Sequence, residues 1–177
     1  MLWKLGPGGQ AGVVLANGSM SSNTGGEDEI RKAMVEGDVV EIMIALPGQL
    51  FLNTQIPVCL WFLTNDKTKN GRNRKEETLF IDARNLGTMK TRVLKILTDE
   101  DIQNIQDTVS SWRSGENYEN IKGFCFSSTT KEIQNNQYLL TPGRYVGIVD
   151  EDDDGLPFKE KIKLSLIHIS EPTRHCL

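Results

Sequence analysis

The sequence predicts an α/β fold, in which the strands of one sheet alternate with helices that pack on its faces. Three short apolar runs, at residues 12–16, 39–45 and 56–64, are typical of buried strands. A segment with helical periodicity, at residues 27–36, lies between the first two runs. A strand, a helix and a second strand in this order are expected to form a right-handed βαβ unit.

The boundaries of the first elements follow from local signals. Residues 12–16 run into an Asn-Gly-Ser turn and then a Gly-rich loop. The helix starts with acidic residues, which suit the helix dipole, places Ile30, Ala33 and Met34 on one face, and ends at Gly37. Pro47 and Gly48 break the second strand. The few residues between the second and third strands leave no room for a helical crossover, so we expect these two strands to be antiparallel.

The second half is expected to begin with a polar loop and a strand at residues 79–83, joined to the third strand as a hairpin. Thr98 is a good N-cap for a helix that runs from Asp99 to about residue 112. One face of this helix is apolar and holds Ile102, Ile105, Val109 and Trp112. Ser128 or Thr129, the latter with Glu132 in a capping box, starts a short helix, and residues 145–149 are a last strand candidate.

Composition narrows the class of protein. The chain has 177 residues, 38% of them apolar and 25% charged, which is typical of one globular domain or part of a larger one. Its net charge of -4 does not point to nucleic acid. Since there is no apolar run of about 20 residues and no signal peptide, we expect a cytoplasmic protein with no membrane contact.

The last residues have a separate origin. Residues 164–174 read LSLIHISEPTR, the translation of a transposase-type sequencing adapter, so we exclude 164–177 from fold reasoning. The alternative is a genuine terminal strand. Both histidines, His168 and His175, fall in or just beyond this segment, together with Cys176. The remaining chain has no histidine, which excludes Ser-His and Cys-His catalysis and His-based metal sites. Cys59 and Cys125 have no metal-ligand or redox-motif spacing, and we expect no metal site.

Six strings in a fixed order carry a resemblance over residues 12–161. They are VLANGSMSS, EIRKAMVEGDVVEIMIALPGQLF, NTQIPVCLWFL, LFIDARNLGTM, LTDEDIQNI and LTPGRYVG. The chain resembles the modification subunit of type I restriction–modification systems, an N6-adenine DNA methyltransferase. The resemblance implies the C-terminal half of a class I S-adenosylmethionine-dependent methyltransferase sheet, which is Rossmann-like, with a mainly helical C-terminal extension.

The implied organisation has four parts. Residues 1–97 are the C-terminal half of the catalytic domain, and residues 98–149 are a helical or mixed extension that could dock a subunit. An acidic linker at 150–163 and the adapter-derived segment 164–177 follow. Residues 12–16 correspond to the strand after the catalytic one, and residues 56–64 to the antiparallel strand that ends this fold. The cofactor loop and the Asn-Pro-Pro-Phe motif of the family are absent and would lie upstream, so the fragment alone is expected to be inactive.

The resemblance assigns Phe51 to the aromatic that stacks on the extruded target adenine. An enzyme that modifies a base in duplex DNA must flip that base into a pocket. The residues alone favour a Phe51 that covers the end of the core, and the resemblance favours the stacking role. Asn53, Thr54 and Gln55 on the same loop are candidates for bonds to the flipped nucleotide, or for bonds to the loop's own amides. Asn17, Gly18 and Ser19 are pocket-rim candidates because they end a sheet strand, although a simple turn also explains them.

Two further groups of residues have a structural and a functional reading, and one pair has a structural reading alone. A basic loop could contact DNA phosphates or be a solvated hairpin; its residues are Lys67, Lys69, Arg72, Arg74 and Lys75. The acidic run Asp99, Glu100 and Asp101 suggests acid–base work, but helix capping explains it fully. Trp61 and Phe62 are expected in the core.

The resemblance implies that the intact enzyme takes S-adenosylmethionine and acts on double-stranded DNA with a specificity subunit and, in some complexes, a restriction subunit. The alternative is a non-enzymatic docking module for the specificity subunit, carried by residues 98–147. A third reading, a methyltransferase acting on protein glutamine, shares the architecture, but the type I strings count against it.

Overall fold

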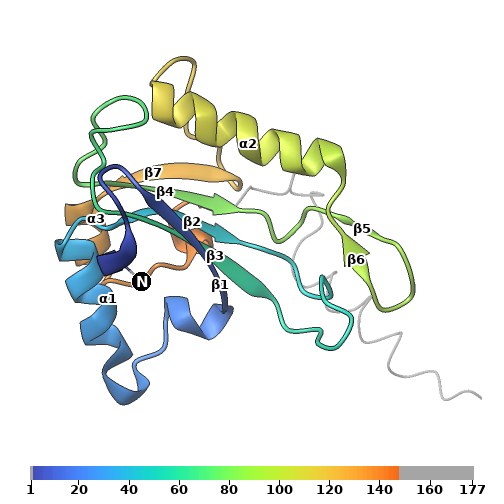
Figure 1. Cartoon of the computed structure of the whole chain (residues 1–177). Helices are drawn as coiled ribbons and strands as arrows, with labels where there is room; N and C mark the ends of the chain where they lie inside the picture. The colour runs from blue at the N-terminus through green and yellow to red at the C-terminus, as the bar shows by residue number, and fades with distance from the viewer. Residues whose placement is uncertain (1, 148–177) are drawn as a thin grey trace, which may run out of the picture.

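The computed structural model describes residues 2–147, which form three layers (Figure 1). A five-stranded sheet in the order β1-β3-β2-β4-β7 is the middle layer. Helix α2 (Asp99–Ser114) packs on one face, while α1 (Glu27–Glu36) and α3 (Thr130–Asn135) pack on the other. The predicted α/β class is confirmed. The predicted acidic linker and the adapter-derived segment lie outside the described residues.

The first three strands have the predicted topology. Strand β3 (Val58–Thr64) lies between β1 (Gln10–Ala16) and β2 (Val40–Ala45) and is antiparallel to both. Strands β1 and β2 are therefore parallel to each other, and α1 connects them. The expected antiparallel pairing of the second and third strands is confirmed.

The predicted hairpin between the third strand and the next strand was wrong. Strand β4 (Glu77–Asp82) is parallel to β2 and does not form a hairpin with β3. The reason is that β1 and β2 already occupy both edges of β3, so the chain must cross to the free edge of β2. The loop 65–76 makes this crossing.

Two strand pairs were not predicted. Strand β7 (Cys125–Thr129), from the C-terminal extension, pairs antiparallel with β4 and completes the sheet. Strands β5 (Thr88–Met89) and β6 (Lys95–Ile96) form a small separate hairpin. Residues 98–147, the described part of the predicted extension, thus form α2 and α3 and also contribute a strand to the main sheet.

The core divides into two clusters because side chains alternate across the sheet. On β2, Ile42 and Ile44 face α2, where Trp112 is fully buried and donates from Nε1 to Ser127 Oγ at 2.8 Å. Met43 and Ala45 face the opposite cluster, with Trp61. Trp61 is buried and Phe62 packs against the α2 cluster, so the expectation that both lie in the core is confirmed.

The predicted apolar face of α1 is confirmed at Met34, which packs against the core cluster on that side of the sheet, and is wrong at its other two positions. Ile30 and Ala33 are exposed, and the helix instead buries Arg31 and Val35. Arg31 is held inside by its guanidinium, which donates to the carbonyl oxygens of Ser22 and Tyr138 and to Asn23 Oδ1. These bonds satisfy a buried charge and fix the rotation of the helix.

The helix caps follow the sequence closely. Thr98 caps α2 and exchanges bonds with Asp101 in a capping box, and Thr129 and Glu132 do the same for α3. The strand predicted at residues 145–149 is not formed in its described part. Tyr145 follows a 3₁₀ turn (Pro142–Arg144), and its ring stacks on Phe80 with centroids 3.9 Å apart.

Within residues 2–147, none of the helices is both long and apolar enough to cross a membrane.

Candidate functional site

The candidate site lies at the edge of the sheet where β1 and β2 end and β3 begins. Register pairs Ala16 with Val58 on one side of β3 and Ala45 with Cys59 on the other. The loop 46–57 and the turn that starts at Asn17 therefore leave the sheet at the same end (Figure 1). The Asn17 N–H donates to the Pro57 carbonyl oxygen at 3.4 Å and connects the two.

The loop 46–57 has a defined shape. Its two arms are joined by backbone bonds from Leu46 N–H to Val58 O at 2.9 Å and from Gln49 N–H to Gln55 O at 3.3 Å. A Cβ at Gly48 would lie 2.6 Å from the Gln55 carbonyl oxygen, closer than any side chain tolerates. The close approach of the two arms therefore requires glycine at this position.

Phe51 stands near the tip of this loop. It forms a bridge with Thr54 across a turn at Leu52 and Asn53, and 44% of its surface is exposed. Among the described residues, the one stacked ring pair is Phe80 with Tyr145, so Phe51 has no aromatic partner. Nearly half of this aromatic side chain is therefore accessible on a loop whose arms are joined by hydrogen bonds.

The polar residues of the loop differ in their engagement. Thr54 Oγ1 accepts a bond from Ile56 N–H at 3.3 Å and so satisfies the loop's own backbone. The side chains of Asn53 and Gln55 are exposed and make no hydrogen bond within residues 2–147. Asn53 and Gln55 therefore present unpaired amide groups at the surface of the loop.

The Asn17–Met20 turn holds one buried side-chain polar atom without a hydrogen-bond partner in the described residues. Asn17 Oδ1 is shielded from solvent and has no hydrogen-bond partner in the described part of the chain. Ser19 Oγ accepts from Trp61 Nε1 at 3.2 Å and lies 3.4 Å from Cys59 Sγ. Ser19 therefore anchors the turn to β3, and Asn17 is the one of the pair with an unused acceptor.

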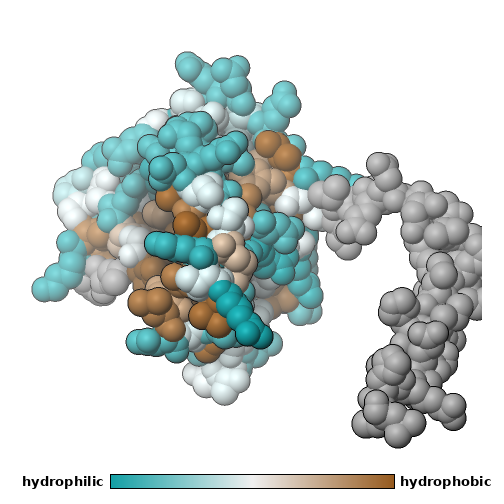
Figure 2. Space-filling model, turned by 90° about the vertical axis from the view of Figure 1, so that its right-hand side faces the viewer, coloured by the Kyte–Doolittle hydropathy of each residue, from teal (hydrophilic) through white to brown (hydrophobic). Residues whose placement is uncertain are grey.

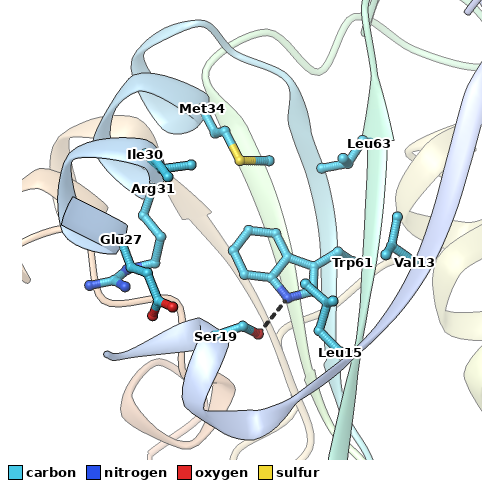
Figure 3. A pocket seen from close by; sticks show the side chains of 9 residues that line it. All are labelled: Val13, Leu15, Ser19, Glu27, Ile30, Arg31, Met34, Trp61 and Leu63. Atoms are coloured by element: carbon cyan, nitrogen blue, oxygen red, sulfur yellow. Dashed lines mark hydrogen bonds between the residues drawn. The ribbon is translucent and has the colours of Figure 1, made fainter. Parts of the chain in front are cut away.

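A pocket of about 280 Å³ lies between α1 and the strands β1 and β3 (Figure 3). Most of its wall is apolar and comes from Val13, Leu15, Ile30, Met34, Trp61 and Leu63. Its polar residues are Ser19, Glu27 and Arg31, and Ser19 and Arg31 already hold partners elsewhere. Such a wall suits an apolar side chain better than a charged ligand.

The basic loop that follows β3 lies at the opposite end of the sheet, because β3 is antiparallel to β2. Lys67 is buried, and its Nζ donates to Asp38 Oδ1 and Glu77 O, both at 2.6 Å. Burial lowers the pKa of Lys67, and the bond to Asp38 opposes that shift. Lys67 is thus used to join the loop to the start of the sheet.

The arginines of this loop are also paired. Arg74 is fully buried and contacts Glu41 at 3.2 Å, and Arg113 of α2 contacts the same carboxylate at 2.9 Å. Arg72 binds Glu77 at 2.5 Å and holds the pKa of that carboxyl below its usual range. Lys69 and Lys75 are exposed. These contacts use Lys67, Arg72 and Arg74 inside the fold, so the loop is not the solvated hairpin of the structural reading, and the three side chains are engaged with protein partners.

Comparison with known proteins decides the family. The model of the N-6 DNA Methylase family matches residues 1–154. The chain belongs to this family. The resemblance carried by the six strings of the sequence is therefore confirmed.

Relatives of this N-6 DNA methylase chain include two methylase subunits. A type I restriction enzyme HindI methylase subunit of Haemophilus influenzae is 53% identical over 163 residues, which cover 92% of this chain and 36% of the relative. The MjaIX methylase subunit of Methanocaldococcus jannaschii is 45% identical, over 89% of this chain and 28% of the relative. The chain thus spans about a third of the length of these relatives.

Solved structures agree on the fold. The type I methyltransferase subunit from Streptococcus thermophilus has a TM-score of 0.63 and 31% identity, over 77% of this chain and 26% of that one. The EcoKI M protein has a TM-score of 0.60 at 14% identity, over 92% of this chain and 39% of that one, which supports the fold alone. The predicted class, an α/β sheet that is part of a methyltransferase fold, is confirmed, and the mainly helical C-terminal extension stays a prediction.

The described residues of this N-6 DNA methylase chain do not fit S-adenosylmethionine as a binding site of their own. Gly8 and Gly9 precede β1 instead of following a strand, and the pocket beside α1 offers an apolar wall to a charged cofactor. Within residues 2–147, no group of three acidic, cysteine or histidine side chains is placed to hold a metal.

Sequence reasoning missed the hairpin of β5 and β6 as a neighbour of the site. The Lys95 N–H donates to the Gln49 carbonyl oxygen at 2.8 Å, which fastens this hairpin to the Phe51 loop. The available signal was the charge of residues 83–98, which contain four basic residues and no acidic one.

Proposed function

We propose that the complete subunit containing this chain transfers a methyl group from S-adenosylmethionine to adenine N6 in double-stranded DNA, in the cytoplasm where that DNA lies. This segment supplies one wall of the target-base pocket. The observation that carries the proposal is Phe51, an exposed ring on a fixed loop at the end of the sheet, in a chain of the N-6 DNA methylase family. A flipped base gains on the order of 1–3 kcal/mol from such a stacking surface.

In this proposal the residues of the segment bind and orient the target base. Phe51 offers one face to the base, while Asn53 and Gln55 supply free amide groups that can bond the base edge or the sugar. Asn17 Oδ1 is an unused acceptor on the neighbouring turn. The cofactor, which supplies the methyl group when bound, and the residues that hold the adenine amino group belong to the rest of the subunit.

The exposed edge of β1 indicates where the rest of the subunit would pack. Within residues 2–147, strand β1 pairs with β3 alone and its other edge has no partner strand, and Val14 and Leu15 on β1 are exposed. Ile30 on α1 is exposed beside the apolar pocket. The upstream part of the subunit would add strands to β1 and cover this pocket, since a free edge and an apolar groove both favour a packed neighbour.

The test is a hybrid subunit in which this chain replaces the matching segment of the Haemophilus influenzae relative. We expect the hybrid, assembled with that organism's specificity subunit, to transfer labelled methyl groups to duplex DNA, and the chain alone to transfer none. A folded and assembled hybrid without activity would contradict the proposal, and so would full activity from the chain alone.

A docking role for residues 98–147 is compatible with this function. The inner face of α2 is occupied by the sheet through Ile105, Val109 and Trp112, while Ile102 is 49% exposed. A subunit that docks on α2 would use this outer face. In the hybrid, Ile102→Asp should weaken assembly with the specificity subunit, whereas Phe51→Ala should spare assembly and reduce methylation; the opposite pattern would refute both assignments.

A further inference from the structure

The hairpin of β5 and β6 is the most basic segment of an acidic chain. Residues 83–98 hold Arg84, Lys90, Arg92 and Lys95 and no acidic residue, whereas the whole chain has a net charge of -4. Two of the acids that flank the segment are engaged: Asp82 pairs with Arg84 at 2.6 Å, and Asp101 accepts the Thr98 N–H at 2.8 Å, whereas Asp99 and Glu100 are exposed. Arg84 is therefore neutralised at the base of the hairpin, and the positive charge that remains in the segment lies on Lys90, Arg92 and Lys95.

Two of the four cations are available at the turn. Lys95 is half-buried, and its Nζ donates to Leu86 O at 3.4 Å. Lys90 and Arg92 are exposed, and neither forms an ion pair within residues 2–147. The turn between them is ordered by Lys90 N–H, which donates to Leu94 O at 2.9 Å, and by Thr91 Oγ1, which accepts from Leu94 N–H at 3.1 Å.

The direction of the hairpin is fixed at its base. Gly87 has a φ of +86°, and a Cβ there would lie 2.8 Å from the Ile96 carbonyl oxygen, so only glycine fits. Lys95 N–H bonds Gln49 O at 2.8 Å, and Gln49 precedes Phe51 by two positions. The basic turn and the exposed ring are thus presented together at one end of the molecule.

Figure 2 shows this end of the molecule. Brown apolar surface alternates there with projecting hydrophilic side chains. The exposed apolar residues of this region are Phe51, Leu52 and Ile56 on the loop and Met89, Val93 and Ile96 on the hairpin. A surface of this kind can contact the sugars and bases of a nucleic acid while its cations bind the phosphates.

We propose that Lys90 and Arg92 bind backbone phosphates of the DNA beside the base that stacks on Phe51. This inference rests on the proposed function and deepens it by adding a phosphate-binding arm that the basic loop after β3 does not provide. The hairpin is fastened to the Phe51 loop by the bond from Lys95 N–H to Gln49 O, so its two cations are presented at the same end of the molecule as the ring. Two phosphate contacts there hold the register of the strand while the base is extruded.

The experiment measures the affinity of the hybrid subunit, in complex with its specificity subunit, for duplex DNA at several salt concentrations. The variant is Lys90→Ala with Arg92→Ala. The matched control is Lys32→Ala with Lys131→Ala, two exposed lysines on α1 and α3. Each lost phosphate contact reduces the slope of log K against log salt by about 0.9, so we expect a decrease of about 2 and roughly 60-fold weaker binding at 0.1 M salt.

The remaining variants separate this arm from other roles. Lys90→Arg with Arg92→Lys keeps both charges and should retain most of the affinity and the slope. A slope that changes no more than in the control overturns the proposal, and so does a variant that loses the specificity subunit while each assembled complex keeps its DNA affinity. If the hybrid methylates DNA and its DNA affinity is unchanged by Lys90→Ala with Arg92→Ala, the phosphate-binding role of the hairpin is refuted and the proposed function stands. A hybrid that neither methylates nor binds DNA refutes the proposed function and the arm together.

Discussion

Replacing Glu41 should destabilise the fold strongly, because two arginines share its carboxylate as their counter-ion. The carboxylate is fully buried on β2 and receives Arg74 Nη2 at 3.2 Å and Arg113 Nη2 at 2.9 Å, so it joins the loop before β4 and the end of α2 to the sheet. Glu41→Leu keeps the volume and leaves the fully buried Arg74 guanidinium without its counter-ion. Removing one partner of a buried pair costs about 3–5 kcal/mol.

The assay is equilibrium unfolding of the chain in urea, with a thermal scan beside it. At 2–4 °C per kcal/mol for a chain of this size, the midpoint temperature should fall by about 6–20 °C. Glu116→Leu, at an exposed site, is the control and should stay within about 0.5 kcal/mol. Adding Arg74→Leu to Glu41→Leu should recover much of the loss, because the unpaired charge is then gone. A loss below about 1 kcal/mol for Glu41→Leu, or no recovery in the double variant, would refute this reasoning.

Three smaller changes test other parts of the structure. Gly48→Ala forces a Cβ to within 2.6 Å of the Gln55 carbonyl oxygen, so the chain should lose about 1–3 kcal/mol in urea unfolding; an unchanged stability would mean that the loop arms are not in close contact. Thr98→Ala removes the N-cap of α2 and should cost about 1 kcal/mol, whereas Thr98→Ser should cost little. Arg72 lowers the pKa of Glu77 below its usual 4.5, so the stability from this pair is present above that pH and is lost as the pH falls through the folded-state value. Glu77→Gln should therefore flatten the acid side of the stability–pH curve below about pH 4.5, and an unchanged curve would contradict that linkage.

Local signals allowed much of the fold to be predicted. The helix caps at Thr98 and Thr129 and the buried strands depend on short-range patterns, and the structure has them as expected. The pairing of β4 could not be predicted, because it depends on which sheet edge is still free after β1 has paired with β3. Strand β7 has a half-polar sequence, CFSST, whose pairing with β4 carries no local signal.

The inward position of Arg31 on α1 could not be predicted for a different reason. Periodicity assigns the inner face to apolar residues, but Arg31 takes an inner position because three oxygen acceptors from other segments surround its guanidinium. The same holds for the basic loop. Its sequence suggests that Lys67 and Arg74 are exposed to solvent, but Lys67 is paired with Asp38 and Arg74 with Glu41. Sequence alone does not reveal a partner that is distant along the chain.

The Phe51 loop was located from sequence at the correct end of the sheet, and its role as a stacking surface remains a proposal. Its neighbour, the β5–β6 hairpin, was missed because strands of two residues leave almost no pattern. The charge of residues 83–98 was the one available signal.

The most direct test of the central claim is single-turnover methylation by the hybrid subunit with Phe51 changed. Phe51→Ala should lower the rate at saturating cofactor by about 5- to 150-fold, as the loss of 1–3 kcal/mol of base stacking requires. Phe51→Trp should keep most of the rate, and Leu52→Ala, at a neighbouring side chain that is 85% exposed, should change it little. A Phe51→Ala hybrid that methylates as fast as the parent would contradict the claim that this loop forms a wall of the target-base pocket.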